Sequence, residues 1–261
     1  MPKDYLGRIL YFLANHWESL LRGAGTTLLI AAVSTLIGCI IGFIVGIIQT
    51  IPVNKKDNPF KRFVLFVARG LLVIYVEVFR GTPMMVQAVF IYYGLLYAGI
   101  KMTWLFASFL IVSINTGAYM AETVRGGILS IDEGQTEGAK AIGMTHFQTM
   151  LYVVLPQALR NILPQIGNNL IINIKDTCVL SVIGVVELFF ASKSIAGSYY
   201  VYFEPYTITM AMYLIMTVFF SRLLRWMEKR MDGPQSYDLA TTDTLAHTSG
   251  LYNFPGKGRK K

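Results

Sequence analysis

The stretch that most limits the fold is the uncharged apolar run from residue 24 to residue 50. It is longer than the roughly 20 apolar residues that an α-helix needs to cross a bilayer. The whole chain is 54% hydrophobic and 15% charged, with a mean hydropathy of +0.51, which is typical of membrane proteins. The sequence therefore predicts an all-α integral membrane protein.

Three glycines in this run, Gly38, Gly42 and Gly46, recur every four residues and so share one helix face. Small residues on one face let a second membrane helix pack closely. Glycine is also frequent in membrane helices in general. A packing face and a chance repeat are therefore both open interpretations.

Four further apolar stretches bring the prediction to about five transmembrane helices: residues 83–100, 104–121, 161–186 and 206–227. Residues 1–22 are predicted to be an amphipathic N-terminal segment at the membrane interface. Residues 187–205, which are rich in aromatic side chains, are expected to return on the outside. Residues 23–231 together then form one transmembrane domain.

Residues 61–80 are apolar enough to span, but their charged side chains fall within about half of the helix circumference. The loop before them (54–62) and the long loop at 122–160 both carry basic residues, as cytoplasmic loops do. An even number of crossings separates two cytoplasmic loops, and the next two spans already supply it. The sequence therefore predicts an amphipathic helix at about 61–80, which lies along the cytoplasmic interface or leads at a tilt into the next span across Gly81-Thr82-Pro83.

The net charge of +8 comes from basic residues clustered between apolar spans. The positive-inside rule explains this pattern better than nucleic-acid binding does, and it places the N-terminus outside and the C-terminus in the cytoplasm. Residues 232–261 are predicted to be a disordered, basic cytoplasmic tail. Cys39 and Cys178 both lie in apolar segments, so neither a disulfide nor a metal site is expected.

Polar side chains inside the predicted fourth span form the main candidate binding site. Lys175 and Asp176 each cost roughly 2.5 to 3.5 kcal/mol in a membrane before pairing, so they should face the bundle interior. Asp176 follows Asn169 by two helical turns and shares its face. An amino-acid zwitterion needs a carboxylate for its ammonium group, and a cation or hydrogen-bond donors for its carboxylate. Asp176 and Lys175 would supply this pair of charges, and Asn169 would supply hydrogen bonds. The alternative is a structural ion pair that locks helices together.

Two other stretches add candidates. The Gly-Thr-Pro break frees backbone groups that bind polar ligands when they line a cavity; alternatively, Thr82 is a plain N-cap with Pro83 as the first helical residue. The second stretch begins at Asn115. Glu122 and Arg125, which follow it, are explained by a local ion pair near the end of a helix. The predicted substrate-binding residues are Thr82, Gln87, Asn115, Asn168, Asn169, Lys175 and Asp176.

A mixed-polarity segment, EGAKAIGMTHFQTMLYVVLP at 137–156, lies between two apolar spans. A short helix with small residues on one face fits a groove of a partner protein. Gly143 lets the chain turn at the helix end, and Pro156 marks the start of the next helix. The residues predicted to dock on such a partner, called the coupling residues below, are Glu137, Gly138, Ala139, Gly143 and Met144.

This segment resembles the EAA loop of ABC import permeases, with Gly138 replacing the first alanine and Val153 replacing an isoleucine. With "VFRGTP", "NTGAYMAETVRGGI" and "KDTCVLSVIGVVEL", residues 20–230 resemble the polar amino-acid branch, the histidine, glutamine and arginine importers. The resemblance implies the type I importer permease fold, with a coupling helix at Glu137 to Met144. It also implies a non-catalytic subunit of a bacterial cell membrane.

The same resemblance implies partners: two ATPase subunits, a second permease that is identical or a sister chain, and an external amino-acid-binding protein. ATP and magnesium would bind to the ATPase, and no cofactor is expected on this chain, which has no phosphate-binding loop motif. The rival class is an ion-coupled secondary transporter, against which the absence of visible inverted repeats counts. No additional carboxylate lies near Asn169, which favours a neutral or acidic amino acid, or cystine or another derivative, over arginine or lysine.

Overall fold

The computed structural model describes residue 2, residues 4–53 and residues 58–231, and every regular element in these ranges is helical. The all-α prediction is confirmed for this part of the chain, whereas the predicted tail at 232–261 lies outside the described residues. The elements follow in the order α1 (Tyr5–Thr50), α2 (Pro59–Gly81), α3 (Met84–Tyr97), α4 (Trp104–Leu129), α5 (Glu133–Ala141), α6 (His146–Thr149), the π-helix η1 (Met150–Val154), α7 (Leu155–Asp176), the 3₁₀-helix η2 (Thr177–Ile183), α8 (Leu188–Tyr199) and α9 (Phe203–Met231).

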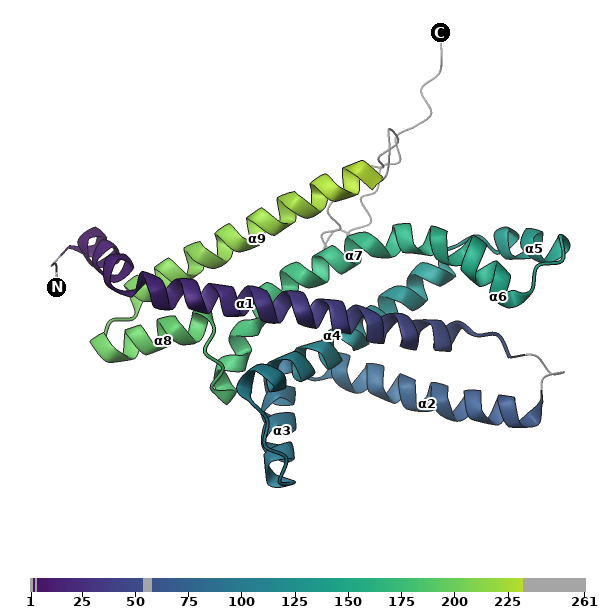
Figure 1. The fold of residues 1–261 in the computed structure, drawn as a ribbon, viewed down its shortest axis with the longest axis horizontal. Coiled ribbons are helices and arrows are strands. Elements are labelled where there is room, and N and C mark those ends of the chain that lie inside the picture. Colours follow the sequence, from purple (N-terminus) through teal and green to yellow (C-terminus); the bar gives the residue numbers. More distant parts are fainter. Residues whose placement is uncertain (1, 3, 54–57, 232–261) are drawn as a thin grey trace, which may run out of the picture.

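The first helix covers both the predicted amphipathic segment at 1–22 and the span that follows it. The Asp4 side chain caps the helix by accepting a hydrogen bond from the Gly7 amide at 2.7 Å. No proline lies between Pro2 and Pro52, so no proline stops the helix in between. Its first turns bend away from the rest (Figure 1) and pack against α8 and α9, where Phe12 is fully buried. The amphipathic segment is therefore packed on protein along its buried face.

The repeated glycines of α1 meet α4 residues that have the same spacing. The glycines are Gly38, Gly42 and Gly46, and the α4 residues facing them are Thr116, Met120 and Val124. A methyl group on Gly38 would lie 2.7 Å from the Thr116 Cβ, and one on Gly46 would lie 2.8 Å from the Val124 Cβ. At Gly42 it would overlap the Met120 side chain. Because no Cβ fits, the packing-face interpretation is confirmed: these positions bring the α1 and α4 backbones together.

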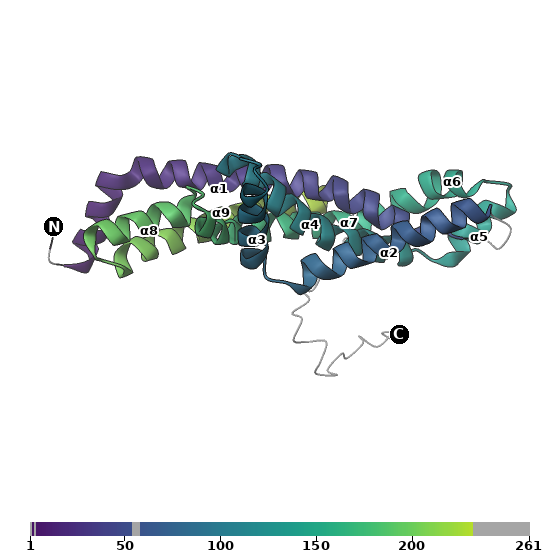
Figure 2. The same cartoon turned by 90° about the horizontal axis from the view of Figure 1, so that it is seen from below.

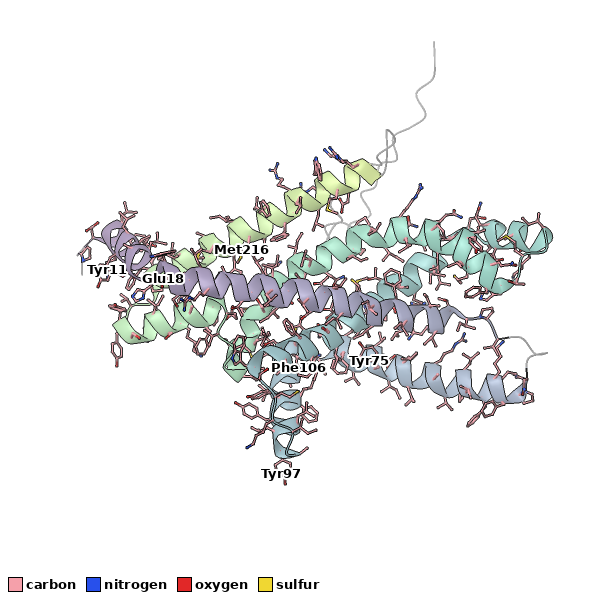
Figure 3. The ribbon with its side chains drawn as sticks, viewed as in Figure 1. Tyr11, Glu18, Tyr75, Tyr97, Phe106 and Met216 are labelled. Carbon is pink, nitrogen blue, oxygen red and sulfur yellow. The ribbon has the colours of Figure 1, made fainter. Side chains whose placement is uncertain are left out.

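The amphipathic helix predicted at 61–80 is α2, and the predicted break separates it from α3. α2 runs back along the C-terminal half of α1 and also contacts α4 (Figures 1 and 2). The Tyr75 hydroxyl donates to the Ile114 carbonyl oxygen at 2.7 Å and joins α2 to α4. α3 then leaves steeply, with Tyr97 protruding at its end (Figure 3). This arrangement favours the tilted lead-in over a helix flat on the interface, since a flat helix would cross α1 and α4 instead of running along them.

Three helices of the described residues are long and apolar enough to cross a membrane, namely α1, α4 and α9. A fourth is obtained if the helical run from His146 to Ile183 and α8, which bend by 51° at their break, count as one span. The five predicted spans correspond to α1, α3, α4, α7 and α9. α3 has 14 residues, fewer than the about 20 that a straight crossing requires.

The two ends of the molecule carry different elements (Figures 1 and 2). The N-terminus, α8 and the start of α9 lie at one end. α5, α6, the end of α1 and the start of α2 lie at the other. The polar loop predicted to couple to a partner is thus far from the N-terminus.

Candidate functional site

A cavity of about 290 Å³ lies where the α2–α3 break meets α4 and α7. Each of the three segments contributes polar residues to a lining that also has apolar ones: Thr82, Pro83, Met84, Asn115, Thr116, Tyr119, Asn169, Ile172, Asn173 and Asp176. Four of the predicted substrate-binding residues line it, namely Thr82, Asn115, Asn169 and Asp176. Residues from stretches far apart in the sequence therefore converge on one site.

Helical spacing explains which side chains of α4 and α7 reach this cavity. On α7 the lining positions are 169, 172, 173 and 176, a single i, i+3, i+4, i+7 face. On α4 they are 115, 116 and 119. The list of predicted site residues missed four of these side chains, the apolar Ile172 and the polar Thr116, Tyr119 and Asn173. Extending the faces of Asn115 and Asn169 by one helical turn would have found Tyr119 and Asn173.

Gln87 does not line the cavity but holds two residues that do. It is buried behind them, where its Nε2 donates to the Thr82 hydroxyl oxygen at 2.8 Å and to the Phe79 carbonyl at 2.9 Å. Its Oε1 accepts a hydrogen bond from Asn115 Nδ2 at 2.9 Å. Gln87 therefore fixes the α2–α3 break to α4.

The alternative reading of Thr82 as the N-cap of the next helix is wrong. Thr82 is the C-cap of α2, and its hydroxyl donates back to the Val78 carbonyl at 2.7 Å. Pro83 occupies the N-cap position of α3 and supplies no side-chain cap. The first backbone amides of α3, those of Met84 and Met85, donate no hydrogen bond among the described residues.

Buried hydrogen bonds hold the α7 side of the cavity in place. Asn173 Nδ2 donates to the Thr35 hydroxyl at 2.7 Å and to the Thr116 hydroxyl at 3.0 Å, which joins α7 to both α1 and α4. Asn169 Nδ2 donates to the Gln165 carbonyl of its own helix at 2.9 Å. The wall is thus fixed before any ligand binds.

The Asp176 carboxylate differs from its neighbours, because it accepts no hydrogen bond and forms no ion pair within the described residues. It is the last residue of α7, and η2 continues the chain as a tighter 3₁₀-helix until Gly184, whose φ is +83°. The cavity therefore lies beside a change in helix type, which is where irregular backbone in membrane proteins is tolerated.

Lys175 and Asn168, both predicted to bind substrate, are exposed and lie outside the cavity lining. Lys175 is adjacent to Asp176 in the chain, yet the two form no ion pair in the described part of the protein. The structure therefore brings Asp176, but not Lys175, to the other candidate residues, and it contains no Lys175–Asp176 lock.

The pair formed by Glu122 and Arg125 is confirmed, and a third charge joins it. Arg125 pairs with Glu122 along α4, while Arg80 of α2 approaches the same carboxylate at 3.8 Å. The Arg80 guanidinium also lies 5.8 Å from the centre of the Tyr119 ring, which lines the cavity. These contacts join α2 to α4 beside the site.

The predicted coupling residues form α5 and the turn after it. Glu137, Gly138 and Ala139 are in the helix, and only Ala139 is buried. Gly143 follows the helix with a φ of +86°, and its amide donates to the Lys140 carbonyl at 3.0 Å. The Met144 amide donates to the Ala139 carbonyl at 3.1 Å, completing a Schellman motif. The prediction that this glycine turns the chain is therefore confirmed.

Two large apolar side chains protrude beside this turn. Ile142 is 80% exposed and Phe147 is 72% exposed. α5 is itself tied to the start of α7 by the Gln157 amide, which donates to Gln135 Oε1 at 3.4 Å. The segment is thus a supported element with an exposed apolar tip.

Pro156 lies in the first turn of α7, as the sequence predicted, although the helical run that α7 continues already begins at His146. Thr145 and Gln148 form a capping box at that start. The turn just before the proline is the π-helix η1, and the Leu155 amide donates to the Met150 carbonyl, five residues back. A proline lacks the amide that would continue the α-helical ladder, so the wider turn absorbs the interruption.

Glu187 is a buried carboxylate that the sequence reading did not single out. It caps α8 by accepting from the amides of Phe189 at 2.8 Å and Phe190 at 2.7 Å, and the Tyr213 hydroxyl donates to it at 2.8 Å. Its acceptors are thus occupied, and it fastens α8 to α9.

Comparisons with known proteins agree with this arrangement. Residues 62–233 match the profile of the family described as binding-protein-dependent transport system inner membrane component. The glutamine transport system permease protein GlnP of Escherichia coli (strain K12) is 37% identical over 214 residues, which cover 81% of this chain and 92% of that protein. The probable amino-acid permease protein YxeN of Bacillus subtilis (strain 168) is 34% identical over 226 residues, covering 85% and 96%.

Solved structures show the same fold. One, described as an amino acid ABC transporter with histidines, is 35% identical with a TM-score of 0.75, covering 88% of this chain and all of that one. A chain of the MetNI methionine ABC transporter, 22% identical with a TM-score of 0.63, shares the fold over 83% of this chain and 95% of that one. The type I importer permease fold is therefore confirmed.

This family implies a membrane location, an ATPase on a separate chain and a substrate-binding protein as partners. The alternative of an ion-coupled secondary transporter is wrong, since the family match covers residues 62–233. The chain belongs to the family of binding-protein-dependent transport system inner membrane components, as a permease subunit of an ABC importer that is not itself catalytic.

Proposed function

We propose that this permease translocates a polar amino acid, and that the cavity between the α2–α3 break, α4 and α7 binds it as a zwitterion. The observation that carries the proposal is the unpaired Asp176 carboxylate in the cavity lining. A carboxylate in a membrane protein is costly unless it is paired. The ammonium group of an amino acid is a partner of the right charge, and the carbonyl end of α7 adds negative potential there.

The substrate carboxylate would bind at the opposite wall. Met84 lines the cavity at the first turn of α3, where backbone amides are free. Amides at a helix N-terminus bind carboxylates because the helix dipole favours negative charge there. Asn115 and Asn169 would then contact the polar side chain. Lys175 and Asn168 would act outside the site.

The names of the relatives favour the same substrate class. The relative from Escherichia coli is named for glutamine transport and the one from Bacillus subtilis for amino acids. A neutral or acidic amino acid agrees with a site whose only lining carboxylate is Asp176 within the described residues. Cystine or another amino-acid derivative is the second candidate.

The transport cycle would use alternating access. Two ATPase subunits, binding ATP and magnesium, would each receive the turn formed by α5, Gly143 and Met144. Closure of the ATPases would move these turns and open the cavity outward to the loaded binding protein. The permease would work as a pair, with an identical or a sister chain, and its N-terminus would lie outside the cell membrane.

The test is the ATPase activity of the complete importer in lipid, with its binding protein, across the twenty amino acids and cystine. Stimulation by one polar amino acid, together with its uptake, is the expected result. Stimulation only by an apolar amino acid or by a ligand without an ammonium group would overturn the proposal.

A further inference from the structure

We propose that the groove between α2 and Val53, which follows α1, binds an anionic phospholipid of the membrane leaflet facing α5. The groove has a volume of about 630 Å³ and is separate from the substrate cavity. It is lined by apolar residues and two arginines: Val53, Pro59, Arg62, Phe63, Phe66, Arg69, Gly70 and Val73. This inference does not depend on which substrate is transported.

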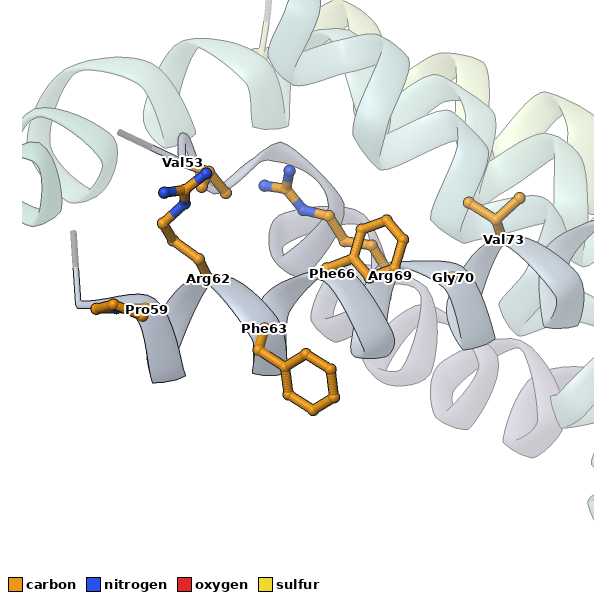
Figure 4. A pocket seen from close by; sticks show the side chains of 8 residues that line it. All are labelled: Val53, Pro59, Arg62, Phe63, Phe66, Arg69, Gly70 and Val73. Atoms are coloured by element: carbon orange, nitrogen blue, oxygen red, sulfur yellow. The ribbon is translucent and has the colours of Figure 1, made fainter. Parts of the chain in front are cut away.

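The two arginines are spaced so that both can contact one phosphate-bearing headgroup. Arg62 and Arg69 are two turns apart on α2, about 10 Å along its axis. Figure 4 shows both guanidinium groups projecting to the same side of the helix, toward Val53. A phosphate ester with a second anionic or hydroxyl-bearing headgroup can contact two cations at this spacing.

Neither guanidinium group is neutralised within the described residues. Arg62 forms no side-chain hydrogen bond or ion pair there. Arg69 uses only its Nε, which donates to the Ile48 carbonyl near the end of α1 at 3.4 Å. Glu77, the carboxylate nearest along α2, lines a neighbouring cavity with Arg69 but forms no ion pair with it in this part of the chain. Within the described residues, the charges of the two guanidinium groups in the groove are therefore uncompensated.

The apolar lining extends from the arginines along α2. Phe63 and Phe66 are 65% and 77% exposed, and Val73 is 44% exposed. In a membrane subunit such a face contacts acyl chains, and cations at its end contact headgroups. Charge complementarity therefore selects an anionic diacyl lipid as the occupant. Basic grooves between helices at the cytoplasmic side of membrane proteins bind such headgroups.

The position of the groove agrees with this occupant. It lies at the end of the molecule that carries α5 and α6 (Figures 1 and 4), and α2 continues from it to the α2–α3 break. A lipid held here would touch the same helix that supplies Thr82 to the substrate cavity.

The experiment compares lipid retention by the complete importer after reconstitution with equal amounts of phosphatidylglycerol and phosphatidylcholine, followed by mild extraction and lipid mass spectrometry. Wild type should retain phosphatidylglycerol preferentially. Each cation near an anionic surface contributes about fivefold in affinity, so Arg62→Gln with Arg69→Gln should lower the retention by about 25-fold. The matched control is Arg160→Gln, which removes an exposed cation of α7 that does not line the groove.

Photoactivatable phosphatidylglycerol gives a second readout on wild type, which holds even if the double variant assembles poorly. Labelling confined to Val53 and to residues 59–73 of α2 is the expected result. Equal retention by wild type and the double variant, equal competition by phosphatidylcholine, or crosslinks from Phe66→Cys to the ATPase or a second permease would each overturn the proposal.

Discussion

Asn115 Nδ2 donates to Gln87 Oε1 across 2.9 Å, and this hydrogen bond joins α4 to α3 directly behind the cavity. Gln87 also donates to Thr82 and to the Phe79 carbonyl. A residue that does not touch the cavity thus positions two that do. Gln87 and Asn115 are both buried, so each depends on the other for hydrogen bonding.

Replacing Gln87 with leucine should weaken both stability and substrate binding. The change removes the Gln87 donor to the Phe79 carbonyl, which keeps Asn115 Nδ2 at 3.3 Å, and it removes the acceptor that Asn115 contacts at 2.9 Å. Losing a buried partner of this kind costs about 1 to 3 kcal/mol. We expect a lower Tm of the purified importer and a higher KM for uptake. Asn115→Leu should have a similar effect, and the double variant should lose much less than the sum, because the two share one network. Fully additive losses would contradict this coupling.

Asp176 and Lys175 should differ sharply, although they are neighbours in the chain. Asp176→Asn removes the charge that faces the cavity, and a hydrogen bond to a charged group contributes about 1.5 to 3 kcal/mol. Uptake efficiency, kcat/KM, should therefore fall by about 10- to 150-fold. Lys175→Gln, the matched control outside the cavity lining, should change it by less than a few-fold. Equal losses in both variants would favour the helix-locking pair instead.

Gly143→Val should uncouple ATP hydrolysis from transport while the protein still inserts. No atom lies within 4 Å of the added Cβ, so the penalty is the left-handed backbone alone, about 1 to 2 kcal/mol for an ordinary residue. Asparagine tolerates this conformation, so Gly143→Asn should retain more coupled uptake than Gly143→Val. The measurement is uptake per ATP hydrolysed in proteoliposomes, and normal coupling in the valine variant would disprove the role of this turn.

Gly42→Val should destabilise the α1–α4 contact, because the added side chain meets Met120 and the backbone of Ala121. Overpacking of this kind costs about 1 to 3 kcal/mol. Gly25→Val is the control, since it lies on the same helix in open space and changes helix propensity equally. The yield of folded protein in detergent and its Tm should fall only for Gly42→Val. A comparable fall for both would show that propensity, not packing, is responsible.

The arrangement of the apolar spans follows from the sequence to a large extent. Apolar length predicted spans that correspond to α1, α4 and α9, and the charge distribution around 61–80 predicted α2 and its break before α3. The spacing of Gly38, Gly42 and Gly46 marked a packing face but could not name α4 as its partner. That α1 is one continuous helix was not predicted, because its amphipathic beginning and its apolar continuation differ in composition. The helix continues because no stop signal such as a proline lies between the two parts.

The sequence by itself determined the class of protein, the helix faces and the residue types of the site. Asn169 and Asp176 share a face because 3.6 residues make a turn, and Gly143 turns the chain because only a residue without Cβ adopts a positive φ freely. The tertiary structure alone decided which faces meet. It brought Thr82, Asn115 and Asp176 to one cavity, moved Gln87 behind it and left Lys175 outside, because contacts between distant segments depend on how helices pack and not on local periodicity.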